Sequence, residues 1–267
     1  MKLCHFHLFI FLFFSFIFSP SSSQSSLPHQ CLDNQKLALL RFKNESFSFS
    51  SSSSSKSGSW KPDTDCCSWE GIKCDNTTGH VISLDLSWDQ LVGDIDSNSS
   101  LFKLHSLMRL NLSHNSFHFF NFNSELFGFP QLVNLTHLDL ANSGFSGQVP
   151  LQMSRLKKLV SLNLSDNQQL KLEKPNLKML VQNMSSLREL CLDKVNMSTR
   201  NGNWCKAISS AAPNLLVLRL WDCSLSGPID SSISNLHLLS ELVLSNNNLV
   251  RSSRCPDKSL FSGLHST

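Results

Sequence analysis

The sequence predicts an α/β solenoid, a horseshoe in which short strands form a parallel sheet on the concave side and longer connections cover the convex side. Three observations favour this fold class: a leucine pattern recurs along most of the chain, an apolar leader begins it, and cysteines cluster just before the first copy of the pattern. A solenoid end needs a cap, and disulfides are suited to staple one. The predicted divisions are a signal peptide (1–24), an N-terminal cap (25–79), about seven repeats (80–250) and an irregular tail (251–267).

The recurring unit is clearest in residues 104–117, where the spacing L-x-x-L-x-x-L-x-L-x-x-N-x-L is that of a leucine-rich repeat. Its L-x-L pair starts at Leu84, Leu110, Leu138, Leu162, Leu190, Leu218 and Leu242. The steps between copies are 24 to 28 residues, and the residue three before each pair is always Leu or Val. One such unit cannot bury its leucines alone, so we expect neighbouring units to stack into a continuous core.

The leader combines Lys2 with an apolar run from Leu8 to Phe18. This run is shorter than the ~20 residues of a membrane span and suits a signal peptide; a buried helix is the alternative. Secretion implies an oxidising compartment, in which the eight cysteines left after removal of Cys4 are able to form disulfides. A net charge of +3, with 16% charged residues, indicates no clustered basic surface, so nucleic acid is not predicted as a partner.

The segment after the leader predicts a short helix. Asp33 is placed to cap its first free amides. The residues expected to face inward are Leu37, Ala38, Leu40 and Phe42. The serine-rich stretch 46–59 then predicts a flexible loop.

A motif of tryptophans and cysteines follows, Trp60…Cys66-Cys67-Ser-Trp69-Glu-Gly71-Ile72-Lys-Cys74. It resembles the N-terminal cap of plant extracellular leucine-rich-repeat proteins, which include receptor-like kinases, receptor-like proteins and polygalacturonase-inhibiting proteins. The resemblance covers about Cys31 to Leu249 and implies Cys31–Cys66 and Cys67–Cys74 disulfides, whereas spacing alone leaves three connectivities open. A zinc site on the last three cysteines is the competing interpretation, although adjacent cysteines are poor tetrahedral ligands.

Two features within the repeats also resemble the plant proteins. Gly93, Gly147 and Gly227 begin endings similar to the plant-type L-x-G-x-I-P, which in the family builds a second, flanking sheet. The pair Asn203-Trp204-Cys205 and Trp221-Asp222-Cys223 resembles an element of receptor-like proteins, which implies a Cys205–Cys223 disulfide. Cys191 is then either a free thiol or the partner of Cys255.

Residues beside the inward leucines are predicted to project from the concave sheet, the surface with which solenoids bind partners. The candidate ligand-binding residues are Asp85, Arg109, His137, Asp139, Glu189, Arg219, Trp221 and Glu241. Trp221 beside Arg219 is the foremost candidate, because Trp and Arg are enriched at interface hot spots. The competing interpretation is that these are ordinary solvated side chains and that Trp221 packs beside Cys223.

Asparagines in this chain suggest two different roles. The N-x-S/T sequons, expected to be glycosylated in a secreted chain, are Asn44, Asn76, Asn98, Asn111, Asn134, Asn163, Asn183 and Asn196. Glycans at Asn111 and Asn163 would cover part of the concave face. The repeat asparagines Asn115, Asn167 and Asn247 are expected instead to satisfy backbone groups of adjacent turns.

No motif indicates catalysis. Two S-x-x-K matches, at 100–103 and 154–157, lack their companion motifs, and the sequence shows no metal-binding or phosphate-binding motif. We therefore expect no enzyme, no cofactor and no metal.

The predicted function is a non-enzymatic extracellular ligand-recognition module, which resembles part of a receptor-like protein in plant defence or development. Its expected partners are a protein or peptide ligand and, in a full-length receptor, a co-receptor kinase. The expected location is the secretory pathway, then outside the cell or on the extracellular face of the plasma membrane. The tail shows neither a cysteine cap nor a membrane span, so we expect roughly the first quarter of such a receptor. The alternatives are a secreted inhibitor of a cell-wall-degrading enzyme and a non-functional receptor copy.

Overall fold

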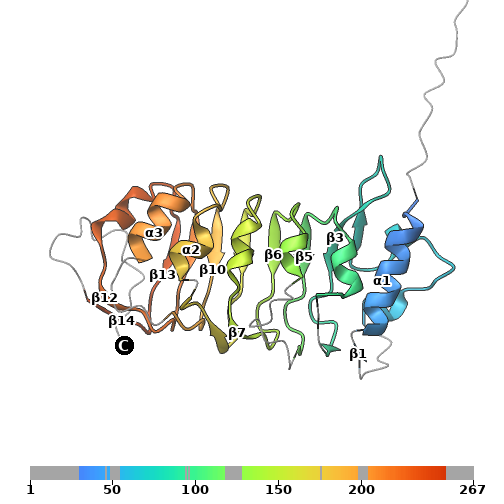
Figure 1. The fold of residues 1–267 in the computed structure, drawn as a ribbon, viewed down its shortest axis with the longest axis horizontal. Coiled ribbons are helices and arrows are strands. Elements are labelled where there is room, and N and C mark those ends of the chain that lie inside the picture. Colours follow the sequence, from blue (N-terminus) through green and yellow to red (C-terminus); the bar gives the residue numbers. More distant parts are fainter. Residues whose placement is uncertain are drawn as a thin grey trace, which may run out of the picture.

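A computed structural model describes residues 30–45, 47–48, 55–93, 95, 97–117, 128–174, 176–197 and 204–250. Within them the chain forms a row of stacked turns, and the elements follow one another along the row in sequence order (Figure 1). The expected signal peptide (1–24), the expected tail (251–267) and Cys255 lie outside the described residues.

One sheet runs along the row. Its strands are β2 (Ile72–Cys74), β3 (Val81–Asp85), β5 (Arg109–Asn111), β6 (His137–Asp139), β8 (Ser161–Asn163), β10 (Glu189–Cys191), β11 (Val217–Arg219) and β13 (Glu241–Val243). From β3 to β13 each strand pairs in parallel with the next, and β2 is antiparallel to β3 at the cap end. The parallel sheet predicted from the leucine period is therefore confirmed.

The strand leucines form the core of the solenoid. The register sets the first leucine of each L-x-L pair opposite its equivalent, and those from Leu84 to Leu218 are at most 1% exposed. Burying one such side chain contributes ~1.5–3 kcal/mol. Leu242 is only partly buried, because no described strand pairs with the outer edge of β13.

Short helices form the opposite, convex side (Figure 1). They are η3 (Ser100–Lys103), η4 (Phe129–Gln131), η5 (Leu151–Arg155), α2 (Leu177–Val181), α3 (Trp204–Ala211) and η6 (Ser231–Asn235). The α-helices α2 and α3 lie in steps of 28 residues between strand leucines, whereas η5 and η6 lie in steps of 24 residues. The described part of the other 28-residue step, from Leu110 to Leu138, carries only η4, so repeat length alone does not decide how much helix the convex side carries.

Smaller sheets flank the turns, as the resemblance implied. Strand β7 (Ser146–Gln148) pairs in parallel with β9 (Gln169–Lys171), and β12 (Ser226–Pro228) pairs in parallel with β14 (Asn248–Val250). Strand β4 (Leu91–Val92) pairs with β1 (Phe47–Ser48) in the antiparallel sense.

Serine-rich residues 46–59 were expected to be a flexible loop, and this prediction is wrong for part of the stretch. Two of its residues form β1, which is ordered by pairing with the backbone of β4. Three others form the 3-10 helix η1 (Ser57–Ser59). The carboxylate of Asp89 accepts from the amides of Lys56 and Ser57 and so fixes η1 to the first repeat.

The cap helix α1 (Asp33–Glu45) covers the first repeat with a face that differs from the predicted one. Ala38 and Phe42 are buried as expected, together with Gln35 and Leu39, whereas Leu37 is 49% exposed. Leu40 is half-buried. The inward face follows 35, 38, 39 and 42, which is the helical period, and Leu37 does not belong to it.

The ends of α1 are polar and connect to other elements. Asp33 lies inside the first turn, with its side chain 99% exposed and 3.9 Å from Lys36 Nζ. Gln35 Oε1 accepts from the amide of Val81 at 2.6 Å, which ties the helix to the start of β3. At the other end, the carboxylate of Glu45 accepts from the backbone amide and hydroxyl of Ser100, at the start of η3.

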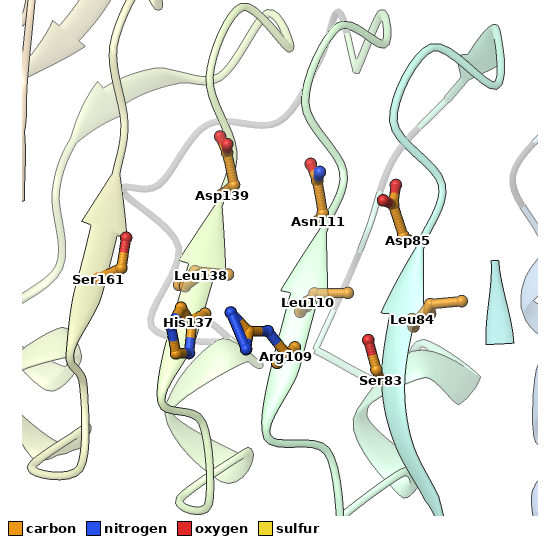
Figure 2. Close-up of a pocket in the computed structure, with 10 residues that line it drawn as sticks. All are labelled: Ser83, Leu84, Asp85, Arg109, Leu110, Asn111, His137, Leu138, Asp139 and Ser161. Atoms are coloured by element: carbon orange, nitrogen blue, oxygen red, sulfur yellow. The ribbon is translucent and has the colours of Figure 1, made fainter. Parts of the chain in front are cut away.

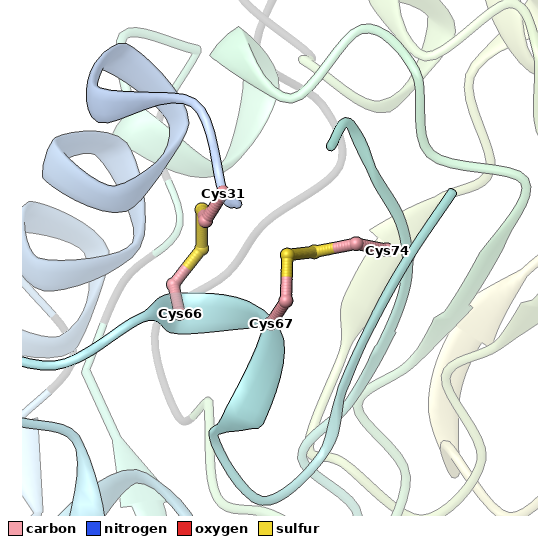
Figure 3. Close-up of side chains that lie close together, drawn as sticks. All are labelled: Cys31, Cys66, Cys67 and Cys74. Carbon is pink, nitrogen blue, oxygen red and sulfur yellow. A yellow bond between two sulfur atoms is a disulfide. The ribbon is translucent and has the colours of Figure 1, made fainter. Parts of the chain in front are cut away.

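Two disulfides staple the cap, as the resemblance implied (Figure 3). Cys31 pairs with Cys66 and Cys67 pairs with Cys74, with Cα atoms 5.5 and 5.4 Å apart. These cysteine sulfurs lie within 4.8 Å of one another, as in a metal cluster, but each is bonded to another sulfur, so none is the thiolate that zinc requires. Gly71, with φ +80°, allows β2 to approach β3, because a Cβ there would lie 2.3 Å from Asp85 O.

Repeat asparagines bridge adjacent turns as predicted. Asn167 Nδ2 donates to the carbonyls of Leu140 and Leu164, at 2.8 and 2.9 Å, and its Oδ1 accepts from the amides of Ser143 and Phe145. The equivalent residues Asn115 and Asn247 make the same kind of bridge. Each satisfies backbone groups that would otherwise be buried without partners.

The predicted Cys205–Cys223 disulfide is wrong. Cys223 occupies the repeat-asparagine position, and its thiol points into the interior of the turn, where it donates to Leu192 O at 3.0 Å. Burial, aided by the charge of Asp193, raises the pKa of this thiol to about 12. Cys205 is buried in helix α3 on the convex side, so the two cysteines serve different layers of the repeat.

Nine described residues other than glycine have a left-handed backbone, with φ from +47° to +62°, and seven of them share one position in the repeat. These seven are Trp88, His114, Asn142, Asp166, Lys194, Asp222 and Asn246. Each is the fourth residue after the first leucine of its L-x-L pair, and the amides of the first six donate to the neighbouring turn. We call this row the turn edge.

Candidate functional site

The N-terminal part of the concave sheet contains an open hollow of about 250 Å³ (Figure 2). Ser83, Arg109, His137 and Ser161 form one row along it, and Asp85, Asn111 and Asp139 form a second row. Leu84, Leu110 and Leu138 lie between the rows. The sequence-predicted residues Asp85, Arg109, His137 and Asp139 are therefore brought together in this N-terminal hollow.

The oxygen-bearing side chains of the second row are held by the chain itself. In Asp85, Asn111, Asp139 and Asn163, Oδ1 accepts from the amide two residues on, at 2.9 to 3.1 Å. These Asx turns end each strand and fix the direction of the side chain. Polar groups in the hollow are therefore positioned before any ligand arrives.

Charges in the hollow are arranged in opposite rows. Burial acts to raise the pKa of Asp85, but hydrogen bonds from Lys56 Nζ, at 2.9 Å, and from Ser87 outweigh it and lower that pKa. Burial raises the pKa of Asp139. Burial, together with the positive charge of Arg109, lowers the pKa of His137. Arg109 itself has no ion-pair partner within 4.0 Å in the described part of the chain.

The C-terminal part of the concave sheet carries a charge cluster of a different kind. Arg219 Nε contacts Asp193 Oδ2 at 2.9 Å, and its Nη1 contacts Glu241 Oε1 at 2.7 Å. The other oxygen of Asp193 accepts from the amide of Trp221 at 2.8 Å. Asp193 is 6% exposed, so this C-terminal cluster has a buried carboxylate at its centre.

Trp221 is held at the rim of the C-terminal cluster. Lys194 Nζ lies 5.0 Å from the centre of the indole ring, within cation–π range, and 2.7 Å from Asp166 Oδ1. Cys191 lies in the same region as a half-exposed thiol, whose pKa burial and the charge of Asp193 raise to about 11. Its predicted alternative partner, Cys255, lies outside the described residues.

Glu189 belongs to neither group. It is exposed on β10, in the row of Arg109 and His137, directly beside Ser161, the last residue of that row in the hollow. The candidate residues thus divide into the N-terminal hollow, the C-terminal cluster and one glutamate between them.

Sequence reasoning missed four residues that shape this face, Lys56, Trp88, His114 and Asp193. Three of them had a signal in the repeat. Asp193 stands two residues beyond the end of β10, as Trp221 does beyond β11, while Trp88 and His114 are turn-edge residues. Lys56 had no such signal, because its stretch was expected to be a flexible loop.

The sequons have different surroundings. Asn44, Asn76, Asn98 and Asn183 are exposed, whereas Asn111, Asn134, Asn163 and Asn196 are half-buried. At Asn111 the sequon coincides with an Asx turn, since both Ser113 N and Ser113 Oγ donate to Asn111 Oδ1. Asp85-Leu-Ser87 builds the same turn without a sequon, so the repeat alone explains the Asn-Leu-Ser sequence.

Family comparisons agree with the fold. Residues 32–75 match the family described as Leucine rich repeat N-terminal domain, and residues 134–156 and 214–236 match Leucine Rich Repeat. These matches and the stacked turns make the chain a leucine-rich-repeat solenoid with an N-terminal cap, a kind of protein-interaction module.

Its curated relatives are plant receptor-like proteins. Receptor-like protein 9DC1 of Solanum pimpinellifolium is 39% identical over 238 residues, which are 84% of this chain and 26% of the relative. Receptor-like protein Cf-9 of the same species is 38% identical over 239 residues, with the same coverage. The chain thus spans about a quarter of the length of these relatives.

Solved structures give the same class. The crystal structure of PEPR1-AtPEP1 matches 82% of this chain and 29% of its own, with a TM-score of 0.61 and 26% identity. The Arabidopsis receptor kinase HAESA, in complex with the peptide hormone IDA and the co-receptor SERK1, matches 82% of this chain and 38% of its own, with a TM-score of 0.56 and 30% identity. In the described ranges no helix combines the length and apolar character that crossing a membrane requires.

Proposed function

We propose that this chain is the ligand-recognition part of an extracellular plant receptor-like protein and that it binds a peptide or protein on its concave face. The similarity to receptor-like proteins supports this role, as do structures of leucine-rich-repeat receptors such as HAESA, which is solved with a peptide hormone and a co-receptor. Signalling in defence or development would then require a membrane anchor and a partner kinase.

The observation that carries the proposal is the N-terminal hollow. Its two rows have opposite character, with Arg109 and His137 on one side and the carboxylates of Asp85 and Asp139 on the other. Asx turns hold the second row in place, so binding orders few protein side chains. A ligand running along the row of turns would place acidic groups on Arg109 and basic groups on Asp139.

Capture of ligands by the immobilised chain tests this proposal. The secreted chain and two variants are exposed to plant extracellular fluid, and retained peptides and proteins are quantified by mass spectrometry. Arg109→Glu reverses the charge in the hollow, whereas Lys178→Glu makes the same change on the convex helix α2, where the lysine is exposed. We expect Arg109→Glu to reduce specific retention about tenfold or more, a loss of about 1.4 kcal/mol. Equal retention by both variants contradicts a concave ligand site.

A secreted inhibitor of a wall-degrading enzyme is the second candidate, since leucine-rich-repeat inhibitors of that kind share the cap motif. Its test is direct: the chain is added to a fungal polygalacturonase and the release of reducing ends is measured. Inhibition that Arg109→Glu abolishes would assign the same surface to an enzyme partner instead of a receptor ligand.

A further inference from the structure

The turn edge carries an exposed aromatic stack that the proposed function does not use. The rings of Trp88 and His114 are nearly parallel, at 7°, with centroids 3.9 Å apart. Trp88 is 70% exposed, the most exposed of the large apolar side chains in the described ranges. Asn142 Nδ2 contacts His114 Nδ1 at 3.0 Å and so helps to fix the orientation of the imidazole.

Trp88 is an unusual choice for its position. Its φ of +62° lies in the left-handed region, where a bulky residue is rare and Asn, Asp and His are favoured. The turn edge follows that preference at His114, Asn142, Asp166, Asp222 and Asn246. Trp88 therefore occupies a strained position and exposes apolar surface as well, a combination that is typical of functional sites.

The stack lies beside the oxygen-bearing row of the hollow. Trp88 follows Asp85 by three residues and His114 follows Asn111 by three, a reach of at most about 10 Å. Trp88 N donates to Ser113 O at 3.1 Å, which places the two turns side by side. An aromatic face and a fixed row of carboxylate and amide groups thus adjoin at this end of the solenoid.

We propose that the Trp88–His114 stack and the adjoining row bind a neutral, β-linked pyranose oligosaccharide that is not attached to the chain. The face of an aromatic ring is negative and attracts the weakly positive C–H groups that line one face of such a sugar. Hydroxyl groups at the edge of the sugar donate to Asp85 and Asp139. These carboxylates repel a uronate and so favour an uncharged sugar.

The surroundings of Trp88 favour a sugar over a protein partner. Interface tryptophans lie at the centre of a packed patch, ringed by further contacts. Trp88 lies at an edge, and the side chains nearest it on the turn edge, His114 and Asn142, are polar. This site shares Asp85 and Asp139 with the hollow of the proposed function, but it adds the turn edge and concerns a different ligand class, so the two are tested with different ligands.

Calorimetric titration with cellohexaose and chitohexaose tests the site. Both are neutral and β-1,4-linked, and hexagalacturonate serves as the anionic comparator. The variant is Trp88→Asn, because Asn142 and Asn246 already occupy the equivalent position with φ +47° and +58°. Asp166→Asn makes a matched change further along the turn edge. All proteins carry Ser113→Ala, which removes the Asn111 sequon and reproduces the alanine that the next repeat has at the equivalent position, Ala141.

We expect at least one of the neutral hexasaccharides to bind, Trp88→Asn to weaken it tenfold or more, and Asp166→Asn to leave it unchanged. Absence of binding for both neutral sugars overturns the proposal, as does tighter binding of hexagalacturonate. The stack could instead contact a glycan attached to Asn111 of the same chain. The NMR signal of the Trp88 indole N–H distinguishes that glycan from a free oligosaccharide. If removal of an Asn111 glycan from the unsubstituted chain moves this signal while free sugars do not, the stack covers the chain's own glycan and the proposal is wrong.

Discussion

The two ends of the concave sheet use the same repeat geometry with opposite electrostatic outcomes. In the N-terminal hollow, Arg109 has no ion-pair partner among the described residues, and it faces a row of oxygens across the inward leucines. In the C-terminal cluster, Arg219 is bound by two carboxylates and Trp221 is held by Lys194. One arginine is available to a ligand and the other is already satisfied.

This difference shows that projection from the concave face does not by itself make a binding residue. Trp221 and Arg219 are the sharpest hot-spot candidates by residue type, yet the protein uses both to stabilise adjacent repeats. A ligand at the C-terminal cluster would have to break contacts that already exist. In the N-terminal hollow a ligand that binds Arg109 breaks no ion pair of the described residues, although Asp85 there is already paired with Lys56.

Removing Asp193 should produce the largest change in stability. Asp193→Ala deletes the buried carboxylate that accepts from Arg219 and from the amide of Trp221, and leaves that amide without its partner. We expect a loss of about 2–4 kcal/mol in the free energy of unfolding. Thermal denaturation should show a fall in Tm of about 5–15 °C.

Asp193→Asn is the control for that change. It preserves an oxygen for the amide of Trp221 but removes the charge that pairs with Arg219, so its Tm should lie between those of the other two proteins. If Asp193→Ala unfolds within about 1 °C of the unsubstituted chain, the C-terminal cluster is not structural, and the comparison between the two ends fails.

The two arginines, which lie in different rows of the concave sheet, provide a comparison with a smaller expected effect. Arg219→Ala removes two ion pairs, one of them to the buried Asp193, and should cost about 1–2 kcal/mol. Arg109→Ala removes no ion pair described in the structure and should change stability by less than about 0.5 kcal/mol. Chemical denaturation of both variants decides the matter: an equal loss for the two would mean that Arg109 is also structural.

The fold was predictable because the same leucine spacing recurs in every repeat. Leucine spacing fixes the strands and their inward faces. The structure differs from the predicted elements mainly in segments that occur only once. Leu37 and Leu39 show this limit, since a single short helix offers no second copy to choose between them. Lys56 and the strand at residues 47–48 were hidden for the same reason, because their order comes from contacts with the repeats and not from their own sequence.

The sequence predicted which residues lie on the concave face, but not which of them already have ion-pair partners. The alternation around the leucines places Arg109 and Arg219 on the concave face, yet it does not say which of them has partners. Arg219 follows its inward leucine and so reaches Asp193 of the preceding repeat, whereas Arg109 precedes its inward leucine, in the row of Ser83 and His137. Cys223 was misassigned in a similar way: its position in the repeat, which suits a polar group inside the turn, outweighs the resemblance that implied a disulfide.

The smallest expected effect is a pH-dependent gain in stability when Asp139 is replaced by asparagine. Burial raises the pKa of this carboxyl above its ordinary value of 3.8, so the folded chain binds the proton more tightly than the unfolded chain. The stabilising effect of protonation is complete below pH 3.8 and is lost as the pH rises through the folded-state pKa. At neutral pH the ionised Asp139 therefore lowers stability.

Asp139→Asn should remove this penalty, because Asn111 and Asn163 already form the same Asx turn with an amide oxygen. We expect a rise in Tm at pH 7 that disappears near pH 3, measured as the difference between the variant and the unsubstituted chain at each pH. The gain should be below about 0.5 kcal/mol, because surface substitutions seldom exceed that size. A loss of stability at pH 7 would mean that the Asp139 carboxylate has a stabilising partner, and that the N-terminal hollow, like the C-terminal cluster, satisfies its own charges.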